Sequence, residues 1–271
     1  MNKNPRDVAP FDPIATKPAE RRVALIGGVS FPFRYCPPGE FAMGDDEGLP
    51  WERPRRKVAL TAGFWLMETQ VTQRQWETIT GSNPSQFGGG ARPVETISWS
   101  ECRAALAKLN EIGAAPDGWR FALPTEAQWE RACRADASEF DSEKLDEFAW
   151  RRENSGKKTC PIALKKPNSW GFYDMLGNVW EWCEDYFGEY SNDAVIDPSR
   201  IDSGDDFFWG EDGELAWTKG AGAFRVARGG AWDCGRERCR PASRDAKKPD
   251  ERYDNLGVRF ALVQESSRSD S

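Results

Sequence analysis

Two cysteines near the end of the chain have a spacing that suits thiol or metal chemistry. Cys234 and Cys239 are separated by four residues on an arginine-rich segment, 229–240, that begins with two glycines. Two thiols at this separation can meet on a loop, where they form a reducible disulfide or offer two soft thiolates to a metal ion. Each can equally be a small buried hydrophobic residue. The rest of the sequence has to decide among these three roles.

The composition narrows the available chemistry. The chain contains no histidine, which removes the commonest general base, the Ser-His-Asp and Cys-His nucleophile arrangements, and every histidine-based zinc or iron site. Any reaction must therefore use thiols, carboxylates, the backbone or a bound ion. The 13 tryptophans are large, rigid and partly polar, and they suit a loop-rich fold without long regular elements.

The bulk properties are those of a soluble protein. The hydrophobic fraction is 39% and the mean hydropathy is −0.71, and no apolar run approaches the roughly 18 residues that a membrane span needs. Residues 1–22 are polar and proline-rich without the apolar core of a secretory signal, so we expect a flexible lead-in and a cytoplasmic protein. An excess of 44 acidic over 37 basic residues argues against non-specific nucleic-acid binding.

The same charge balance predicts the role of several arginines. With 37 basic and 44 acidic groups on one compact chain, we expect pairing with carboxylates for four arginines in the last part of the sequence: Arg228, Arg240, Arg244 and Arg259.

Three helices are expected, because three capping boxes stand at suitable places in the chain. The boxes pair Thr72 with Gln75, Ser98 with Glu101, and Thr125 with Gln128. Gly81 and Gly113 should end the first two helices. Beyond residue 140 the helical periodicity fades.

Short strands are expected around these helices, at 23–26, 31–35, 58–60, 63–67, 224–228 and 256–263. The acidic, aromatic-rich segment 197–214 is expected to be a surface loop, and 264–271 a polar tail. Strand–helix units do not alternate, so a doubly wound sheet is not expected. The pattern predicts one α+β domain over 23–263 with little regular secondary structure.

Several ordered motifs resemble the sulfatase-modifying-factor family, whose domain is also called formylglycine-generating-enzyme-like. The resemblance runs from about Cys36 to Val263, and its motifs lie at 38–44, 70–76, 93–99, 123–130, 171–182, 225–232 and 255–259. It implies a variant of the C-type lectin fold with little regular structure, which agrees with the α+β prediction.

The resemblance also implies a chemistry for the two cysteines. In formylglycine-generating enzymes, two cysteines just after the Gly-Gly turn hold Cu(I) and use O2 to oxidise a cysteine of a sulfatase to formylglycine. Cys234 and Cys239 match those two by position, and paired thiolates are ligands that Cu(I) prefers. Arg236 and Arg238 should lower the pKa of the thiols, and Trp180 is expected to line the cysteine pocket. These three residues are the candidates for substrate binding.

Other features of the sequence favour alternatives to a copper-dependent oxidase. Ala231 stands where serine is common, the segment after Cys239 is short, and Phe260 occupies a usual cysteine position. Many relatives carry cysteines at the positions of both Cys183 and Cys239, which suggests a packed or disulfide-linked pair. The variable proteins of diversity-generating retroelements use this fold for binding without catalysis. The partner is therefore either a polypeptide substrate or a protein ligand, and a family branch that uses three histidines on iron is excluded.

The resemblance also implies a calcium site before the Trp-Glu-Trp sequence. The family binds Ca2+ there through a side chain, two backbone carbonyls and a glutamate, and the matching residues are Asp174, Gly177, Val179 and Glu181. All of them supply the hard oxygen donors that Ca2+ prefers. Acidic residues in turns can equally be ordinary caps or solvated charges.

Overall fold

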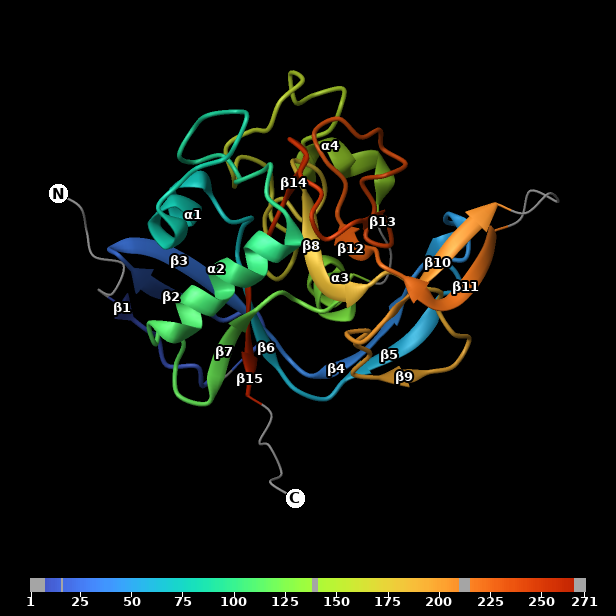
Figure 1. Cartoon of the computed structure of the whole chain (residues 1–271), viewed down its shortest axis with the longest axis horizontal. Coiled ribbons are helices and arrows are strands. Elements are labelled where there is room, and N and C mark those ends of the chain that lie inside the picture. Colours follow the sequence, from blue (N-terminus) through green and yellow to red (C-terminus); the bar gives the residue numbers. More distant parts are fainter. Residues whose placement is uncertain (1–7, 16, 138–140, 210–214, 266–271) are drawn as a thin grey trace.

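A computed structural model describes residues 8–15, 17–137, 141–209 and 215–265 (Figure 1). Within these residues the chain forms four small sheets, four α-helices and two short 3-10 turns. Long segments without regular structure connect them, as the α+β prediction requires. None of the helices in this part of the chain is long and apolar enough to cross a membrane.

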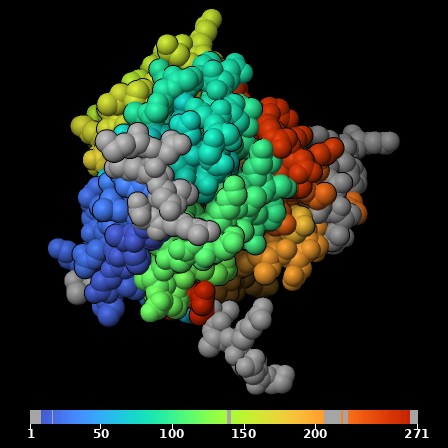
Figure 2. Space-filling model, turned by 60° about the vertical axis from the view of Figure 1, so that its left-hand side comes forward, coloured from blue at the N-terminus to red at the C-terminus, as the bar shows by residue number. Residues whose placement is uncertain are grey.

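The largest sheet has six strands and carries two of the helices. Its strand order is β1 (Val8–Ala9), β2 (Arg21–Ile26), β3 (Val29–Cys36), β6 (Phe64–Met67), β15 (Ala261–Gln264) and β7 (Trp119–Ala122). Helices α1 (Gln73–Thr80) and α2 (Trp99–Glu111) contact β3 and β7. Their apolar residues, including Trp76 and Leu106, pack into one core with Phe33 and Trp65 of the sheet. In Figure 2 the green segment that includes α2 runs across the face between the blue N-terminal strands and the orange-to-red C-terminal part.

The three smaller sheets occupy the other side of the molecule (Figure 1). The four-stranded sheet has the order β13 (Arg244–Lys247), β12 (Arg225–Arg228), β8 (Trp180–Tyr186) and β14 (Leu256–Gly257). The three-stranded sheet has the order β4 (Gly39–Met43), β5 (Arg56–Leu60) and β9 (Val195–Ile196), and β10 (Gly204–Trp209) pairs with β11 (Leu215–Gly222). Helix α3 (Glu126–Arg134) contacts β4, β8 and β12, so it lies where these sheets meet.

The three predicted helix starts are confirmed. The side chains of Thr72, Ser98 and Thr125 each accept a hydrogen bond from the backbone N–H three residues on. The side chain of that later residue accepts one in turn from the backbone N–H of the capping residue. Gly81 follows α1 with a φ of +85°, which a glycine adopts at no steric cost. Helix α4 (Leu145–Phe148) and the 3-10 turns Pro50–Glu52 and Ser142–Lys144 were not predicted, because elements of three or four residues are too short for periodicity to register.

Three predictions about chain segments need correction. The predicted strand 256–263 is two strands, because the chain passes from the four-stranded sheet at β14 to the six-stranded sheet at β15. The predicted surface loop 197–214 contains strand β10, while residues 210–214 lie outside the described part. Within the expected lead-in 1–22, β1 pairs with β2; residues 1–7 of the lead-in and 266–271 of the tail also lie outside the description.

Buried arginines join α3 to the four-stranded sheet. Arg228 of β12 is fully buried and pairs with Glu130 and, at 3.4 Å, with Glu126. Arg244 of β13 makes a two-pronged pair with Glu126 at 2.5 and 2.8 Å. Burial raises the pKa of Glu126, and the charges of Arg244 and Arg228 outweigh burial and hold that pKa below its ordinary value. The helix and the two strands are therefore locked in one relative position.

The predicted pairing of the four arginines is confirmed. Arg240 contacts Glu52 at 2.6 Å and Asp45 at 2.9 Å. Arg259, in the segment between β14 and β15, is fully buried and binds both carboxylate oxygens of Glu181 at 2.9 and 3.0 Å. A buried charge that loses its partner costs several kcal/mol, so these pairs constrain the fold more strongly than surface ion pairs do.

Replacing Arg259 tests this constraint. We expect Arg259→Met to lower the free energy of unfolding by about 3–5 kcal/mol, because Glu181 would stay buried with no cation beside it. The control is Arg252→Met, which breaks an ion pair with Glu101 whose side chains are 47% and 42% exposed and should change the stability far less, because solvent screens exposed ion pairs. Urea unfolding measures both, and equal losses would show that burial does not distinguish the two pairs.

Candidate functional site

The Gly229–Gly230 turn brings the two cysteines of the 229–240 segment toward the end of β12. Gly229 and Gly230 have φ values of +101° and +78°. A side chain at Gly230 would place its Cβ 2.9 Å from the sulfur of Cys239 and 2.7 Å from the carbonyl oxygen of Arg238. The returning chain at 238–239 thus packs directly on this turn, and only glycine leaves room for it.

A series of tight turns then shapes the loop that carries the thiols. The backbone N–H groups of Cys234, Arg238 and Cys239 donate to carbonyls three residues earlier, at 3.0, 3.1 and 3.3 Å. Cys239 is fully buried and Cys234 is partly buried. The two sulfurs are close enough that a charge on Cys234 raises the pKa of Cys239. The structure therefore brings the two predicted residues together.

Burial dominates the acid–base behaviour of both thiols. It raises the pKa of Cys234 to about 11 and that of Cys239 to about 12. Arg238 lowers the pKa of Cys234 only in part, and Arg236 is exposed and donates to the carbonyl of Ser142 at 2.9 Å. The expected lowering of a thiol pKa is therefore confirmed for Arg238 acting on Cys234, but it does not make this thiol acidic, because the desolvation of a thiolate outweighs the effect of a partly solvated cation. Both sulfurs carry protons at neutral pH unless a bound metal ion displaces them.

Of the three candidate substrate-binding residues, two lie beside Cys234. Trp180 lies close enough to Cys234 to lower the pKa of that thiol slightly, and the guanidinium of Arg238 lies 5.0 Å from the centre of the Trp180 ring. Trp180 is only 2% exposed and belongs to the core against which Cys234 packs, so it does not project from the surface. Arg236 points to Ser142 and stands apart from this group.

The sulfurs are present as thiols. All seven cysteines lie in the described part of the chain, and each is free. Cys183 of β8 packs in the same apolar core as Cys239 but forms no disulfide with it. Cys234 and Cys239 also form none, so both of them keep a sulfur that can act as a metal ligand or as a reductant.

A second candidate site lies in the turns at 174–181. The backbone carbonyls of Asp174, Gly177 and Val179 all face one atom, the side-chain nitrogen of Gln70, at 3.2, 3.2 and 3.0 Å. Gly177 has a φ of +79°, and a Cβ there would lie 2.1 Å from the carbonyl oxygen of Trp150. Three carbonyl oxygens that point at one position are a typical arrangement around a cation.

Unpaired oxygens at the same place match the chemistry of calcium. One carboxylate oxygen of Asp174 is buried without a hydrogen-bond partner, and so is the side-chain oxygen of Gln70. Burial raises the pKa of Asp174 to about 6, although its other oxygen accepts a hydrogen bond from the N–H of Ala163 at 2.7 Å. Turning the Gln70 amide over would present its oxygen in place of its nitrogen. These donors therefore fit a hard cation such as Ca2+.

Glu181 differs from the other expected calcium ligands. Arg259 holds both of its oxygens, and the indole of Trp129 donates to one of them at 2.7 Å. Among the described residues no group of three or more acidic or cysteine side chains is placed to hold a metal, so a calcium site here depends on backbone oxygens. Gln70 was missed by the sequence analysis, since it lies over a hundred positions before these residues and has no spacing signal toward them.

The two candidate sites are joined by backbone hydrogen bonds. The N–H of Gly177 donates to the carbonyl of Gly229 at 2.8 Å, and the N–H of Trp232 donates to the carbonyl of Asn178 at 2.9 Å. The turns at 174–181 thereby support the turn that carries the cysteines.

Comparison with known proteins places this architecture. A family model described as the sulfatase-modifying factor enzyme 1-like domain matches residues 34–264. The chain belongs to this family, and the predicted C-type-lectin-like fold of the formylglycine-generating-enzyme type is confirmed.

Several relatives of this chain are named formylglycine-generating enzyme. The formylglycine-generating enzyme of Streptomyces coelicolor is 28% identical over 246 residues, which cover 83% of this chain and 64% of that protein. The enzyme of Bos taurus is 28% identical over 238 residues, which cover 79% of this chain and 56% of that protein. The chain thus spans less than two-thirds of the length of these relatives.

Solved structures with this fold include proteins with other names. Treponema denticola variable protein 1 superposes with a TM-score of 0.75 at 27% identity, over 89% of this chain and 98% of that one. PvdO from Pseudomonas aeruginosa superposes with a TM-score of 0.70 at 23% identity, over 92% and 99% of the two chains, and this likeness concerns the fold alone.

Replacing Gly230 tests the close approach at the cysteine loop. We expect Gly230→Ala to lower the free energy of unfolding by more than about 2 kcal/mol, because backbone strain adds to the collision with the Cys239 sulfur. Gly118→Ala is the matched control: its φ is +74° and nothing lies within 4 Å of the added carbon, so only the strain of about 1 kcal/mol should appear. Urea unfolding that gives equal losses would mean that the loop yields to the added carbon without cost.

Proposed function

We propose that this chain is an oxidase of the formylglycine-generating type, which oxidises a cysteine of a partner polypeptide with O2 and Cu(I). The observation that carries the proposal is the pair of free thiols, Cys234 and Cys239, held together behind the Gly229–Gly230 turn. The named relatives that match most of this chain support it.

The residues around the thiols suit this role. The sulfurs of Cys234 and Cys239 would hold Cu(I). When bound there, the copper would supply the redox chemistry that lets O2 react with a thiol. Trp180, which is buried beside Cys234, excludes water from one side of its sulfur. Arg238, which lies against the Trp180 ring, supplies a positive charge close to Cys234, where a substrate thiolate would approach.

The overall reaction balances only with a reductant. Conversion of a cysteine side chain to an aldehyde with release of hydrogen sulfide gives up two electrons, whereas reduction of O2 to water takes four. The other two electrons and their protons must come from an external thiol, which leaves as a disulfide. Reducing conditions with an excess of a small thiol are therefore part of any activity assay.

A binding domain without catalysis is the second candidate. The likeness to Treponema denticola variable protein 1, which extends over 98% of that chain, favours it. So do the protonated, buried thiols, which need no role beyond packing. In this case the partner would be a protein or other ligand, and the cysteines would serve only the core.

Titration with Cu(I) distinguishes the two candidates. We expect the reduced protein to take up one equivalent of Cu(I) against a competing chelator, and the Cys234→Ala/Cys239→Ala double variant to take up none. The control is Cys183→Ala, which removes a fully buried thiol from the same core and should leave copper binding intact.

Melting temperatures of all variants establish that they fold. Wild-type binding no stronger than that of the double variant would contradict the oxidase proposal and leave the binding domain. Loss of copper binding in Cys183→Ala as well would place the ligands elsewhere.

We also propose that Ca2+ binds among Asp174, Gly177, Val179 and Gln70, near the carboxylate of Glu181. A ligand that binds only the folded state stabilises it, by about 2.7 kcal/mol at a hundredfold excess over its Kd. Removal of calcium by a chelator should therefore lower the melting temperature of the wild type. Asp174→Ala should melt at the same temperature with and without calcium, whereas Asp117→Ala, at an exposed turn, should respond as the wild type does. An unchanged wild-type melt after verified removal of calcium would contradict this site.

A further inference from the structure

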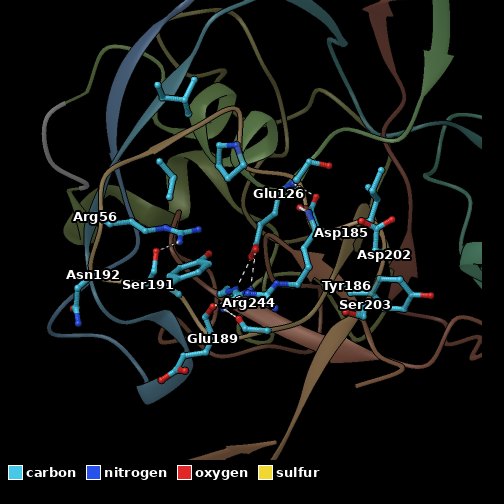
Figure 3. Close-up of a pocket in the computed structure, with 18 of the residues that line it drawn as sticks. Arg56, Glu126, Asp185, Tyr186, Glu189, Ser191, Asn192, Asp202, Ser203 and Arg244 are labelled. Atoms are coloured by element: carbon cyan, nitrogen blue, oxygen red, sulfur yellow. Dashed lines mark hydrogen bonds and ion pairs between the residues drawn. The ribbon is translucent and has the colours of Figure 1, made fainter. Parts of the chain in front are cut away.

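A large polar cavity, whose lining includes neither Cys234 nor Cys239, lies between the three-stranded sheet and the segment that follows β8 (Figure 3). Its volume is about 1020 Å³. Residues of the 188–203 segment form much of its wall, and Arg56 of β5 and Arg244 of β13 reach it from the sheets. Two isoleucines at its edge, Ile196 and Ile201, are 71% and 54% exposed. A cavity of this size is large enough for a small organic molecule.

The three arginines that line this cavity differ in their pairing. Arg244 donates two hydrogen bonds to the two carboxylate oxygens of Glu126, and Arg200 pairs with Asp205 at 3.0 Å. Arg56 has no ion pair with any residue in the described part of the chain. One of its terminal nitrogens approaches the hydroxyl of Ser191 at 3.4 Å, and its Nε is buried without a hydrogen-bond partner.

An aromatic ring holds Arg56 in place. The guanidinium lies 4.3 Å from the centre of the Tyr190 ring, and the guanidinium of Arg244 lies 4.0 Å from the same centre. Figure 3 shows Arg56 near Ser191 and Asn192 at one end of the cavity, away from Asp185 and Asp202 at the other. The Arg56 guanidinium is thus a positioned cation, and the carboxylate whose charge reaches it, Glu126, is bound by Arg244. Its Nε is enclosed by the protein, so only its terminal nitrogens can face the cavity.

Two of the acidic groups that line the cavity are already engaged. Glu126 is held by Arg244, and the two oxygens of Asp185 accept hydrogen bonds from the N–H groups of Glu126 and Arg200 at 2.7 and 2.8 Å. A buried cationic donor without a partner is costly, and a planar oxyanion is the group that matches a guanidinium fork. The acidic groups that line the rest of the cavity disfavour a doubly charged phosphate. A single carboxylate is the charge that this cavity tolerates best.

We propose that this cavity binds a small molecule with one carboxylate group, through the guanidinium of Arg56 and the hydroxyl of Ser191. The rest of such a molecule would lie against the two exposed isoleucines at the edge, Ile196 and Ile201. The site is independent of Cys234 and Cys239 and does not rest on the oxidase proposal.

Benzoate and D-glucuronate are suitable probes, since each carries one carboxylate. The carboxylate is attached to an apolar ring in benzoate and to a hydroxyl-rich ring in glucuronate. Benzamide and D-glucose, which lack the charge, are their matched controls, and inorganic phosphate tests the alternative anion. Ligand-observed NMR or calorimetry should detect at least one carboxylate with a Kd in the millimolar range or below, and much weaker binding of its uncharged counterpart.

Variants on β5 assign the binding to Arg56. We expect Arg56→Ala to weaken carboxylate binding by at least about tenfold, and Arg56→Lys to retain part of it. Lys57→Ala removes the same charge from the next position, where the lysine is 60% exposed and pairs with Glu40, and should change nothing. Melting curves show whether each variant is folded.

The following results would overturn the proposal: no binding of either carboxylate by the wild type, equal binding of the uncharged counterparts, or equal affinity in folded Arg56→Ala. Phosphate that binds more tightly than both carboxylates would overturn the assignment to a monocarboxylate. Binding that disappears in the Cys234→Ala/Cys239→Ala variant would place the ligand at the cysteine pocket.

Discussion

The fold depends on buried arginine–glutamate pairs that connect elements far apart in the sequence. Arg228 and Arg244 reach α3 from neighbouring strands, and Arg259 reaches Glu181 on β8. Desolvating each of these ions is expensive, so each is compatible with the folded state only when its partner is in place. This requirement makes the pairs specific: a small shift of α3 or of the segment after β14 would leave a charge alone in the core.

The cysteine pocket is built on this rigid frame. Strand β12 carries Arg228 and leads directly into the Gly229–Gly230 turn, so the position of the turn follows from the ion pairs. Burial within the frame also raises the pKa of Cys234 and Cys239. Thiols with raised pKa values stay protonated and unreactive until a metal ion with affinity for thiolates displaces their protons. The same burial would suit a purely structural pair, which is why metal affinity is the property that separates the two functions.

The carbonyl cluster at 174–179 shows how a turn can be supported from a distance. Its oxygens gather around the side chain of Gln70, and its backbone is bonded to that of the cysteine loop. The unpaired oxygens of Asp174 and Gln70 mean that the hydrogen bonds of the protein alone do not complete this cluster. A bound cation would satisfy them and strengthen the link to the cysteines.

Local signals were the most reliable part of the sequence analysis. The three capping boxes defined the helix starts, because a cap depends on residues only three positions apart. Dependence on short-range patterns also explains the predictions that were wrong. Residues 256–263 read as one strand since hydrophobic periodicity does not register a change of sheet, and the β10 strand lies in a segment whose acidic residues resembled a loop. The spacing of Cys234 and Cys239 in the sequence predicted that the two thiols lie near each other. It could not predict their pKa values, because burial is a property of the whole fold.

The sequence by itself determined the family, the helix starts, the absence of histidine chemistry and the candidate thiols, because each of these depends on residue types and short spacings. Only the tertiary structure decided which carboxylate each arginine meets, that Gln70 faces the carbonyls of residues 174–179, and that Arg56 forms no ion pair with a described residue beside the cavity. These are long-range outcomes of packing, in which desolvation decides between alternatives that a linear sequence leaves equal.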